Sequence, residues 1–163
     1  MSRLVATFFY VGLAPKAPGT FGSLAALVLA YLLHRFAGFP VFAAVTVLVF
    51  FVGWRASALA TAGQPDHDPG EIVIDEVVGQ WLALWPLSAG LWIGGADPAI
   101  FPYPGWIAGF VLFRLFDILK PWPVSWADRK QTALGVMLDD VLAGVMAAIL
   151  VTLGAAIAHG WLR

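Results

Sequence analysis

The sequence contains no cysteine and few charged residues. None of its 163 residues is Cys and 12% are charged, whereas about 25% of residues are charged in typical soluble domains. The lack of cysteine excludes disulfide scaffolds, thiolate metal sites and cysteine nucleophiles. The formal net charge is −1, which provides no electrostatic basis for binding nucleic acid. We therefore expect no nucleic-acid partner.

Hydrophobic residues make up 61% of the chain. One soluble core of this size cannot bury so much apolar surface, because most residues of a small domain touch water. A membrane-spanning helix needs about 20 mostly apolar residues, with about 17 as the lower limit. The runs that meet or approach this length are residues 21–39, 41–62, 77–93, 105–119 and 141–157. They predict an all-α, polytopic membrane bundle of about five membrane-embedded helices, forming a single domain over residues 1–163.

The charged residues are distributed unevenly between the two faces of this predicted bundle. If all five runs span, one face receives the N-terminus and the loops 63–76 and 121–140. Nine of the ten acidic residues and six of the nine basic residues lie on or near that face. The positive-inside rule then makes it the cytoplasmic face. Residues 1–11 carry one Arg and no small-residue cleavage site, so we expect a short interfacial or re-entrant segment there.

Four polar clusters lie on this face, next to the apolar runs. They are residues 14–23 (APKAPGTFGS), 67–76 (HDPGEIVIDE), 114–123 (RLFDILKPWP) and 135–144 (GVMLDDVLAG). In the first, Lys16 and the free N–H groups of a helix start form a candidate phosphate cradle, and Thr20 or Ser23 can cap that helix. Asp139 and Asp140 repeat the acidic pair Asp75 and Glu76, which suggests two helix starts with similar roles.

Each cluster also has a purely structural explanation. Acidic residues in the first turn of a helix stabilise it by about 0.3–1 kcal/mol through the helix dipole. Asp117 can pair with Arg114 or with Lys120, each three residues away on a helix. However, acidic groups from three spans at one depth, with basic residues between them, also suit Mg²⁺ and a phosphate group. The substrate class that fits best is a phosphate ester at the membrane surface.

Together, the four clusters resemble the phosphatidylglycerophosphatase A family, the Mg²⁺-dependent bacterial membrane phosphatases that convert phosphatidylglycerophosphate to phosphatidylglycerol. The matching residues are Ala17-Pro18-Gly19-Thr20-x-Gly22-Ser23, His67-Asp68-x-Gly70 with Ile72-Val73-x-Asp75-Glu76, Phe113-Arg114-x-x-Asp117-x-x-Lys120-Pro121-Trp122-Pro123, and Gly135-Val136-Met137-x-Asp139-Asp140-x-x-Ala143-Gly144. They occur in the family's order and cover nearly the whole chain. The family often has a Gly pair where Thr132 and Ala133 stand here.

The resemblance implies a phospholipid substrate, Mg²⁺ as cofactor and an active site on the cytoplasmic side of the bacterial inner membrane. The candidate metal ligands are Asp75, Glu76, Asp117, Asp139 and Asp140. Asp75 and Asp140 are also candidate catalytic residues. The candidate phosphate contacts are Lys16, Thr20, Arg114 and Lys120. A homo-oligomer is compatible with this assignment.

His67 is a third candidate catalytic residue. An unperturbed histidine has a pKa of about 6.5, which suits a general acid for the leaving group or a partner of a carboxylate. A histidine that caps a loop turn is the structural alternative. The chain has neither a cysteine nucleophile nor an Asp-x-Asp-x-Thr motif, and its three His residues form no paired phosphohistidine motif. We therefore expect direct attack by metal-activated water rather than a phosphoenzyme.

A small transporter or ion-coupled carrier is the competing interpretation. Such proteins place ionisable groups near the middle of the bilayer on broken helices. Only Arg55 and the Arg114 and Asp117 pair fit that pattern here, because the other acids gather at the ends of the runs. A phosphatidyltransferase would carry an Asp-Gly-x-x-Ala-Arg stretch, which this sequence lacks.

Overall fold

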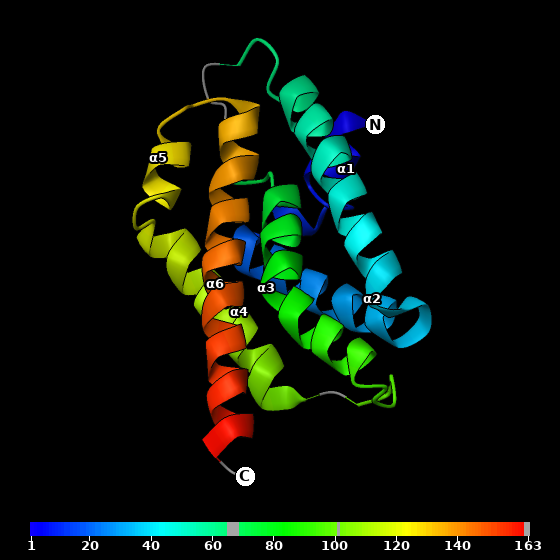
Figure 1. The fold of residues 1–163 in the computed structure, drawn as a ribbon. Helices are drawn as coiled ribbons and strands as arrows, with labels where there is room; N and C mark the ends of the chain where they lie inside the picture. The colour runs from blue at the N-terminus through cyan, green and yellow to red at the C-terminus, as the bar shows by residue number, and fades with distance from the viewer. Residues whose placement is uncertain (65–68, 101, 162–163) are drawn as a thin grey trace.

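The chain is a bundle of helices (Figure 1). The computed structural model describes residues 1–64, 69–100 and 102–161. The elements in order are α1 (Ser2–Ala6), the 3-10 helix η1 (Val11–Leu13), α2 (Pro18–Ala60), α3 (Ile74–Ile93), α4 (Tyr103–Leu119), α5 (Val124–Asp128) and α6 (Ala133–Trp161). All the regular structure in these described ranges is helical, so the predicted all-α class is confirmed.

Helix α2 changes direction at Gly38. This residue has φ 74° and ψ 172°, a conformation that is strained for any residue with a Cβ. A Cβ there would also lie 2.2 Å from the ring of Trp92, at the far end of α3. Pro40 follows, and its missing N–H weakens the helix at the same point. The expected boundary between the runs 21–39 and 41–62 is therefore a sharp bend, and the two halves of α2 run in different directions (Figure 1).

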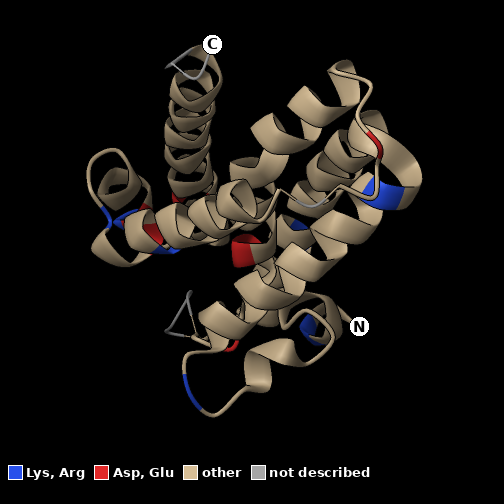
Figure 2. Cartoon of the chain, turned by 90° about the horizontal axis from the view of Figure 1, so that it is seen from below, with Lys and Arg blue, Asp and Glu red and all other residues tan. Residues whose placement is uncertain are grey.

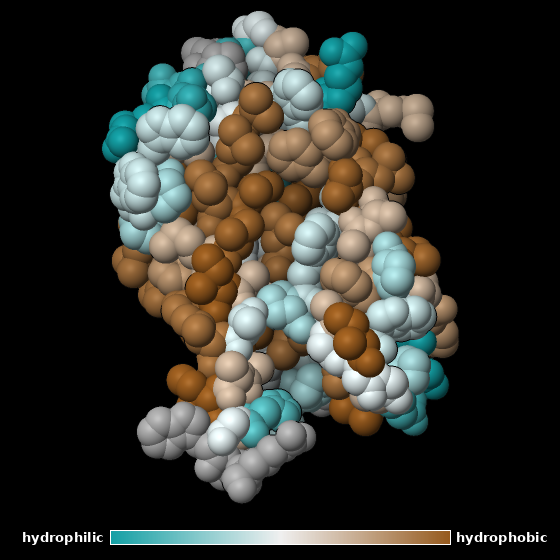
Figure 3. Space-filling view, in the orientation of Figure 1, coloured by the Kyte–Doolittle hydropathy of each residue, from teal (hydrophilic) through white to brown (hydrophobic). Residues whose placement is uncertain are grey.

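Among the residues that the structure describes, two helices are long and apolar enough to cross a membrane, namely Pro18–Ala60 and Ala133–Gly160. Only 22% of the residues in the most apolar window of each are buried inside the protein, so most of the residues in these windows are half-buried or exposed. Hydrophobic residues cover the middle of the face seen in Figure 3. Charged residues occupy only short parts of the chain (Figure 2). An outer surface of this kind is typical of contact with lipid.

Helix α3 lies between α2 and α6 and is bonded to both halves of α2. The indole Nε1 of Trp81 donates to the carbonyl of Ala26 at 2.8 Å in the first half. The indole Nε1 of Trp85 donates to Oγ1 of Thr46 at 3.2 Å in the second half. These bonds satisfy polar groups that would otherwise be unpaired in an apolar interior. Helix α3 is consequently fixed in position relative to both halves of the bent helix.

Helix α6 begins earlier than the apolar pattern predicts. The run 141–157 lies inside a helix that begins at Ala133. The residues before the apolar run are thus helical as well. Asp139 and Asp140 therefore lie well inside α6, whereas Asp75 and Glu76 occupy the first turn of α3. The expectation of two equivalent helix starts is wrong. Part of the loop 121–140 is also helical, as α5.

Two glycines allow the backbones of helices α3 and α6 to approach each other closely. A Cβ on Gly144 would lie 2.3 Å from the backbone oxygen of Gly79, and a Cβ on Gly79 would lie 2.6 Å from the backbone oxygen of Asp140. Small residues permit this kind of backbone approach between membrane helices. The contact sets the distance between the helices that carry Asp75 and Asp140.

We expect Gly144→Val to destabilise the protein by about 1–3 kcal/mol, because the added side chain meets rigid backbone. Thermal unfolding in detergent measures the effect as a lower melting temperature. Gly154→Val is the matched control on the same helix, since a Cβ at Gly154 meets nothing within 4 Å. Equal melting temperatures for the two variants would show that the close approach does not stabilise the fold.

Candidate active site

Three carboxylates from two helices form a cluster inside the bundle. Asp75 and Glu76 belong to the first turn of α3, and Asp140 belongs to α6. One oxygen of each lies within 4.8 Å of the others. Asp75 is 6% exposed and Asp140 is 3% exposed. The structure thus brings together three of the five carboxylates that the sequence suggests as metal ligands.

Two oxygens of the cluster are buried without a hydrogen-bond partner among the described residues. They are Oε2 of Glu76 and Oδ2 of Asp140. A buried polar atom without a partner is costly, and a buried charge is more so, unless a counter-charge is present. Oxygen atoms of carboxylates are the ligands that Mg²⁺ and Ca²⁺ prefer. The residues present therefore fit a hard divalent cation.

Helix α4 brings a positive charge to the edge of this cluster. Nη1 of Arg114 pairs with Oδ2 of Asp117 and lies 3.8 Å from Oε1 of Glu76. The expected pairing of Arg114 with Asp117 is confirmed. Asp117 is also a charged neighbour of Asp140. Asp117 therefore lies beside the cluster, where it orients Arg114.

The start of α2 reaches the same place through Gly19. A Cβ on Gly19 would lie 2.1 Å from Oε1 of Glu76 and 3.1 Å from Nη1 of Arg114. Only glycine permits this approach without displacing the carboxylate. Gly19 was not among the predicted site residues. The sequence does show a Pro-Gly-Thr stretch at a helix start. From sequence alone, however, a glycine required for close packing cannot be distinguished from one that forms a turn.

The helix start itself differs from the expected capped form. Ala17 is the N-cap, with φ 49°, and no side chain caps α2. The hydroxyl of Ser23 donates instead to the carbonyl of Gly19 at 2.9 Å, so the expected cap by Thr20 or Ser23 is wrong. Lys16 is exposed in the loop before α2, and Thr20 is partly buried in its first turn. Pro18 has no N–H, and the N–H of Thr20 donates to the carbonyl of Ala17 at 2.9 Å, which leaves the N–H of Gly19 in this first turn for an anion.

Lys120 joins three segments next to the cluster. Its Nζ donates to Oδ1 of Asp128 in α5 and, at 2.6 Å, to Oδ2 of Asp139 in α6. Oδ1 of Asp139 accepts the backbone N–H of Asp140 at 3.0 Å. Burial alone would lower the pKa of Lys120, but the hydrogen bonds to Asp128 and Asp139 outweigh it and raise that pKa above its ordinary value. Lys120 is thus paired with Asp128 and Asp139, not with Asp117 as the spacing also allowed.

His67 and Gln80 are the remaining residues at which sequence and structure differ in what they show. His67, the third candidate catalytic residue, lies outside the described residues. Gln80 was not predicted, yet it is fully buried one helical turn after Glu76. Neither its Nε2 nor its Oε1 has a hydrogen-bond partner among the residues the structure describes. A glutamine within an apolar run was the available signal, but sequence alone does not show on which side of a helix it is buried.

The N-terminal segment holds the chain that leads into α3. The backbone N–H of Val73 donates to the carbonyl of Ala6 at 3.0 Å. Nη2 of Arg3 pairs with Oε2 of Glu71 at 2.9 Å. A Cβ on Gly12 would lie 2.0 Å from the backbone oxygen of Glu71. These contacts fix the point at which Asp75 and Glu76 enter the bundle.

Comparison with known proteins assigns the chain to a family. The sequence pattern of the family described as phosphatidylglycerophosphatase A matches residues 4–155. The chain belongs to the phosphatidylglycerophosphatase A family. Phosphatidylglycerophosphatase A from Escherichia coli is 37% identical over 162 residues, which cover 98% of this chain and 84% of the relative. The protein of the same name from Haemophilus influenzae is 40% identical over 151 residues, or 91% and 85% of the two chains.

A third relative carries a different name. A protein from Bacteroides thetaiotaomicron, called putative phosphatidylinositol-3-phosphatase, is 38% identical over 154 residues, covering 91% of this chain and 89% of the relative. No solved structure matches the chain. The names of all three relatives are those of phosphatases, so family membership makes this chain a phosphatase as well. The predicted resemblance to the phosphatidylglycerophosphatase A family is confirmed.

Replacing Lys120 should destabilise the fold more than replacing Arg3, which belongs to an exposed ion pair. In its pair with Asp139 the two side chains are 29% and 6% exposed, so Lys120→Met leaves a buried carboxylate uncompensated, at a cost of about 1–3 kcal/mol. Arg3→Met is the control, because Arg3 and Glu71 are 65% and 37% exposed and exposed pairs contribute about 1 kcal/mol or less. Urea or thermal unfolding in detergent compares them. Equal losses would contradict this account of Lys120.

Proposed function

We propose that this chain hydrolyses phosphatidylglycerophosphate to phosphatidylglycerol and phosphate, in phospholipid biosynthesis, using Mg²⁺. The observation that carries the proposal is the cluster of Asp75, Glu76 and Asp140, with oxygens within 4.8 Å of one another. Arg114 lies next to it, at 3.8 Å from Glu76. Acidic ligands for a metal beside a basic group for an anion suit a phosphate monoester. The family and the names of two relatives support the particular lipid.

The metal proposal depends on the chemistry of the donor atoms. The clustered carboxylates have buried oxygens, two of which lack a protein partner among the described residues, Oε2 of Glu76 and Oδ2 of Asp140. Asp75, Glu76 and Asp140 would hold the ion. When bound, Mg²⁺ supplies positive charge that polarises the phosphoryl group and activates water. Asp117 and Asp139 would act from beside it, since they are paired with Arg114 and Lys120.

The remaining residues have separate tasks in this proposal. Arg114 is held by Asp117, so its guanidinium is already oriented when a phosphate enters and can offset negative charge that develops on the phosphoryl oxygens. The start of α2 contributes the N–H of Gly19, and Thr20 and Lys16 lie there as further phosphate contacts. Lys120 holds Asp139, whose carboxylate accepts the N–H of Asp140. Lys120 thereby positions Asp140, in addition to any contact with the phosphate.

Water is the proposed nucleophile, and the leaving group needs a proton. The sequence has no cysteine nucleophile, no Asp-x-Asp-x-Thr motif and no paired histidine motif, and these features support attack by water over a phosphoenzyme. Asp75 or Asp140 would accept the proton of the attacking water. His67 is the proposed donor to the glycerol oxygen as the phosphorus–oxygen bond breaks. A phosphoenzyme trapped in a single turnover would contradict direct attack by water.

We further propose that the chain crosses the inner membrane with about five embedded helices and that its site faces the cytoplasm. The start of α3, the end of α4 and the first half of α6 supply the site residues. Alternating spans would bring these parts to one face, and that face carries most Lys and Arg residues. A substrate made on the inner leaflet would then reach the site directly.

The transporter alternative receives less support from the geometry. The clustered carboxylates belong to the first turn of α3 and the first half of α6, not to the middle of a broken helix. A different lipid is the more serious competitor, because one relative is named as a phosphatidylinositol-3-phosphatase. Both lipids are diacylglycerol-based and carry a phosphate monoester on the headgroup. The assay must therefore compare them.

The first test is phosphate release by purified protein in detergent, from phosphatidylglycerophosphate and from phosphatidylinositol 3-phosphate. We expect release from the first, dependence on added Mg²⁺ and loss with EDTA. Asp140→Asn should reduce the rate by at least about a hundredfold, since one carboxylate ligand is lost. Asp97→Asn is the control, because Asp97 lies in the loop after the far end of α3 and its Oδ1 accepts the backbone N–H of Ala99 at 2.8 Å. Metal-independent release would refute the proposal.

The Gly19→Ala variant tests whether activity can be lost without loss of fold stability. The new methyl group would meet Oε1 of Glu76 at 2.1 Å, and a flexible carboxylate can move away at little cost to stability. We expect activity to fall by about tenfold or more and the melting temperature to stay unchanged. A displacement of about 1 Å in a catalytic site can reduce the rate by about a hundredfold. Gly90→Ala on α3 is the control, because a Cβ there meets nothing within 4 Å. Full activity of Gly19→Ala would exclude Glu76 from the site.

A further inference from the structure

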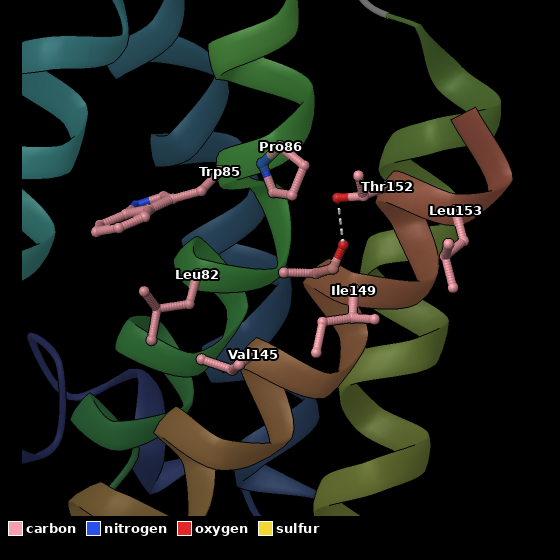
Figure 4. A pocket seen from close by; sticks show the side chains of 8 residues that line it. Leu82, Trp85, Pro86, Val145, Ile149, Thr152 and Leu153 are labelled. Carbon is pink, nitrogen blue, oxygen red and sulfur yellow. Dashed lines mark hydrogen bonds between the residues drawn. The ribbon is translucent and has the colours of Figure 1, made fainter. Parts of the chain in front are cut away.

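An apolar groove runs along α3 and α6. One cavity, of about 380 Å³, lies between them and is lined by Leu82, Trp85 and Pro86 of α3 and by Val145 and Ala148 of α6, among others (Figure 4). In the close-up, Pro86 of α3 lies toward Thr152 of α6, while Trp85 points to the other side of α3. The lining of this cavity is almost entirely hydrocarbon.

A second cavity, of about 260 Å³, continues the first toward the carboxylates. It shares Leu82 and Trp85 with the first cavity and adds Val78 of α3 and Leu138 of α6. It also borders the second half of α2 through Phe50. Leu138 precedes Asp139, and Val78 lies one turn beyond the acidic pair of α3. The two cavities therefore form one groove that begins at the level of the candidate active site.

The hydroxyl groups in the groove are bonded within the protein. Oγ1 of Thr152 donates to the carbonyl of Ala148 at 2.8 Å. Oγ1 of Thr46 donates to the carbonyl of Phe42 at 2.9 Å and accepts the Nε1 proton of Trp85 at 3.2 Å. These hydroxyls are already satisfied, so the groove does not call for a polar occupant. Its surface suits a hydrocarbon chain.

The register of α3 connects the groove with the acid cluster. Asp75, Val78, Leu82 and Pro86 follow a spacing of three, four and four residues, so they share one stripe of the helix. The stripe begins with a carboxylate and continues with groove-lining residues. A molecule whose charged end lies at Asp75 and whose apolar part follows this stripe would contact both.

The groove is longer than the hydrocarbon depth of one leaflet of a bilayer. At 1.5 Å per residue, the α6 segment from Leu138 to Leu153 spans about 22 Å. Half of the hydrocarbon core is about 15 Å thick. An acyl chain that starts near the headgroup region and ends near the bilayer centre would therefore fit along it.

We propose that this groove binds one acyl chain of the phospholipid whose phosphate is hydrolysed at Asp75, Glu76 and Asp140, an inference that rests on the proposed function. A diacyl lipid held by its phosphate must direct its tails away from the carboxylates, and the groove begins there. Because lipid tails are as apolar as the groove, transfer from bilayer to groove gains little hydrophobic free energy. The groove acts by positioning: it fixes the lipid so that the phosphate stays at the carboxylates.

Substrates with different tails provide the test. Ala148→Phe and Val145→Phe would each fill part of the groove, and Gly154→Phe is the matched control on α6, where a Cβ meets nothing within 4 Å. Each variant is assayed in mixed micelles with a long-chain substrate and with a water-soluble analogue bearing two short acyl chains. We expect kcat/KM for the long-chain substrate to fall by about fivefold or more in both groove variants. The short-chain value, which reports an intact site, should not change.

The other outcomes count against the proposal in distinguishable ways. Equal loss on both substrates would mean that the substitutions damage the site or the fold, and no loss on either would mean that no tail lies in the groove. If the wild type hydrolyses neither substrate, the proposed function itself fails.

A measurement independent of activity covers that last case. A long-chain phospholipid with a photoreactive group in its tail should label α3 and α6 groove residues in the wild type, and less so in Ala148→Phe. Absence of labelling there, or equal labelling of the wild type and Ala148→Phe, would overturn the acyl-chain proposal.

Discussion

Carboxylates that lie close together in a water-poor interior repel one another, and the surrounding helices are arranged so as to hold them in place. Asp75, Glu76 and Asp140 have oxygens within 4.8 Å of each other, where the repulsion between like charges increases as the local dielectric constant falls. Arg114 offsets part of this repulsion from one side. Within the proposed function, a cation between the oxygens offsets the remainder. The centre of this bundle is therefore a place for positive charge rather than a purely apolar core.

Close approach of backbones is what brings the charges together. Gly79 and Gly144 let α3 and α6 meet, and Gly19 lets the start of α2 reach Glu76. In a membrane, where lipid tails provide no net hydrophobic driving force for helix association, such contacts depend on packing and on hydrogen bonds. The bonds from Trp81 and Trp85 to α2 supply the latter. Helix α3 thus carries the packing contact at Gly79, the hydrogen bonds of Trp81 and Trp85, and two of the clustered carboxylates.

Much of this arrangement could be predicted from the sequence, and the exceptions have a common cause. Apolar runs located the helices because each run has about the length and composition that a membrane helix requires. The acid clusters were visible because charge is scarce in such a chain. Local spacing also suggested the pairing of Arg114 with Asp117. It did not predict that Lys120 pairs with Asp128 and Asp139, because that choice depends on how α5 and α6 are placed.

The remaining exceptions likewise depend on tertiary contacts. The start of α6 at Ala133 could not be predicted because the residues before the apolar run mix small, polar and acidic types. The role of Gly19 was hidden because only the neighbouring Glu76 and Arg114 make its lack of a side chain matter. The bend of α2 was indicated by Gly38 and Pro40, although whether they make a loop or a kink depends on Trp92 packing against the glycine. Each case requires a partner distant in the sequence.

The position of Asp140 in α6 has a consequence for how the protein is made. Chains emerge from the ribosome with the N-terminal part first, and the carboxylates of α3 precede Asp140 by more than sixty residues. A nascent chain can form α2, α3 and α4 while it still lacks both this third carboxylate and the glycine contact that sets its distance. The cluster is completed only when the last helix joins the others. A product truncated before α6 therefore has only the two carboxylates of α3.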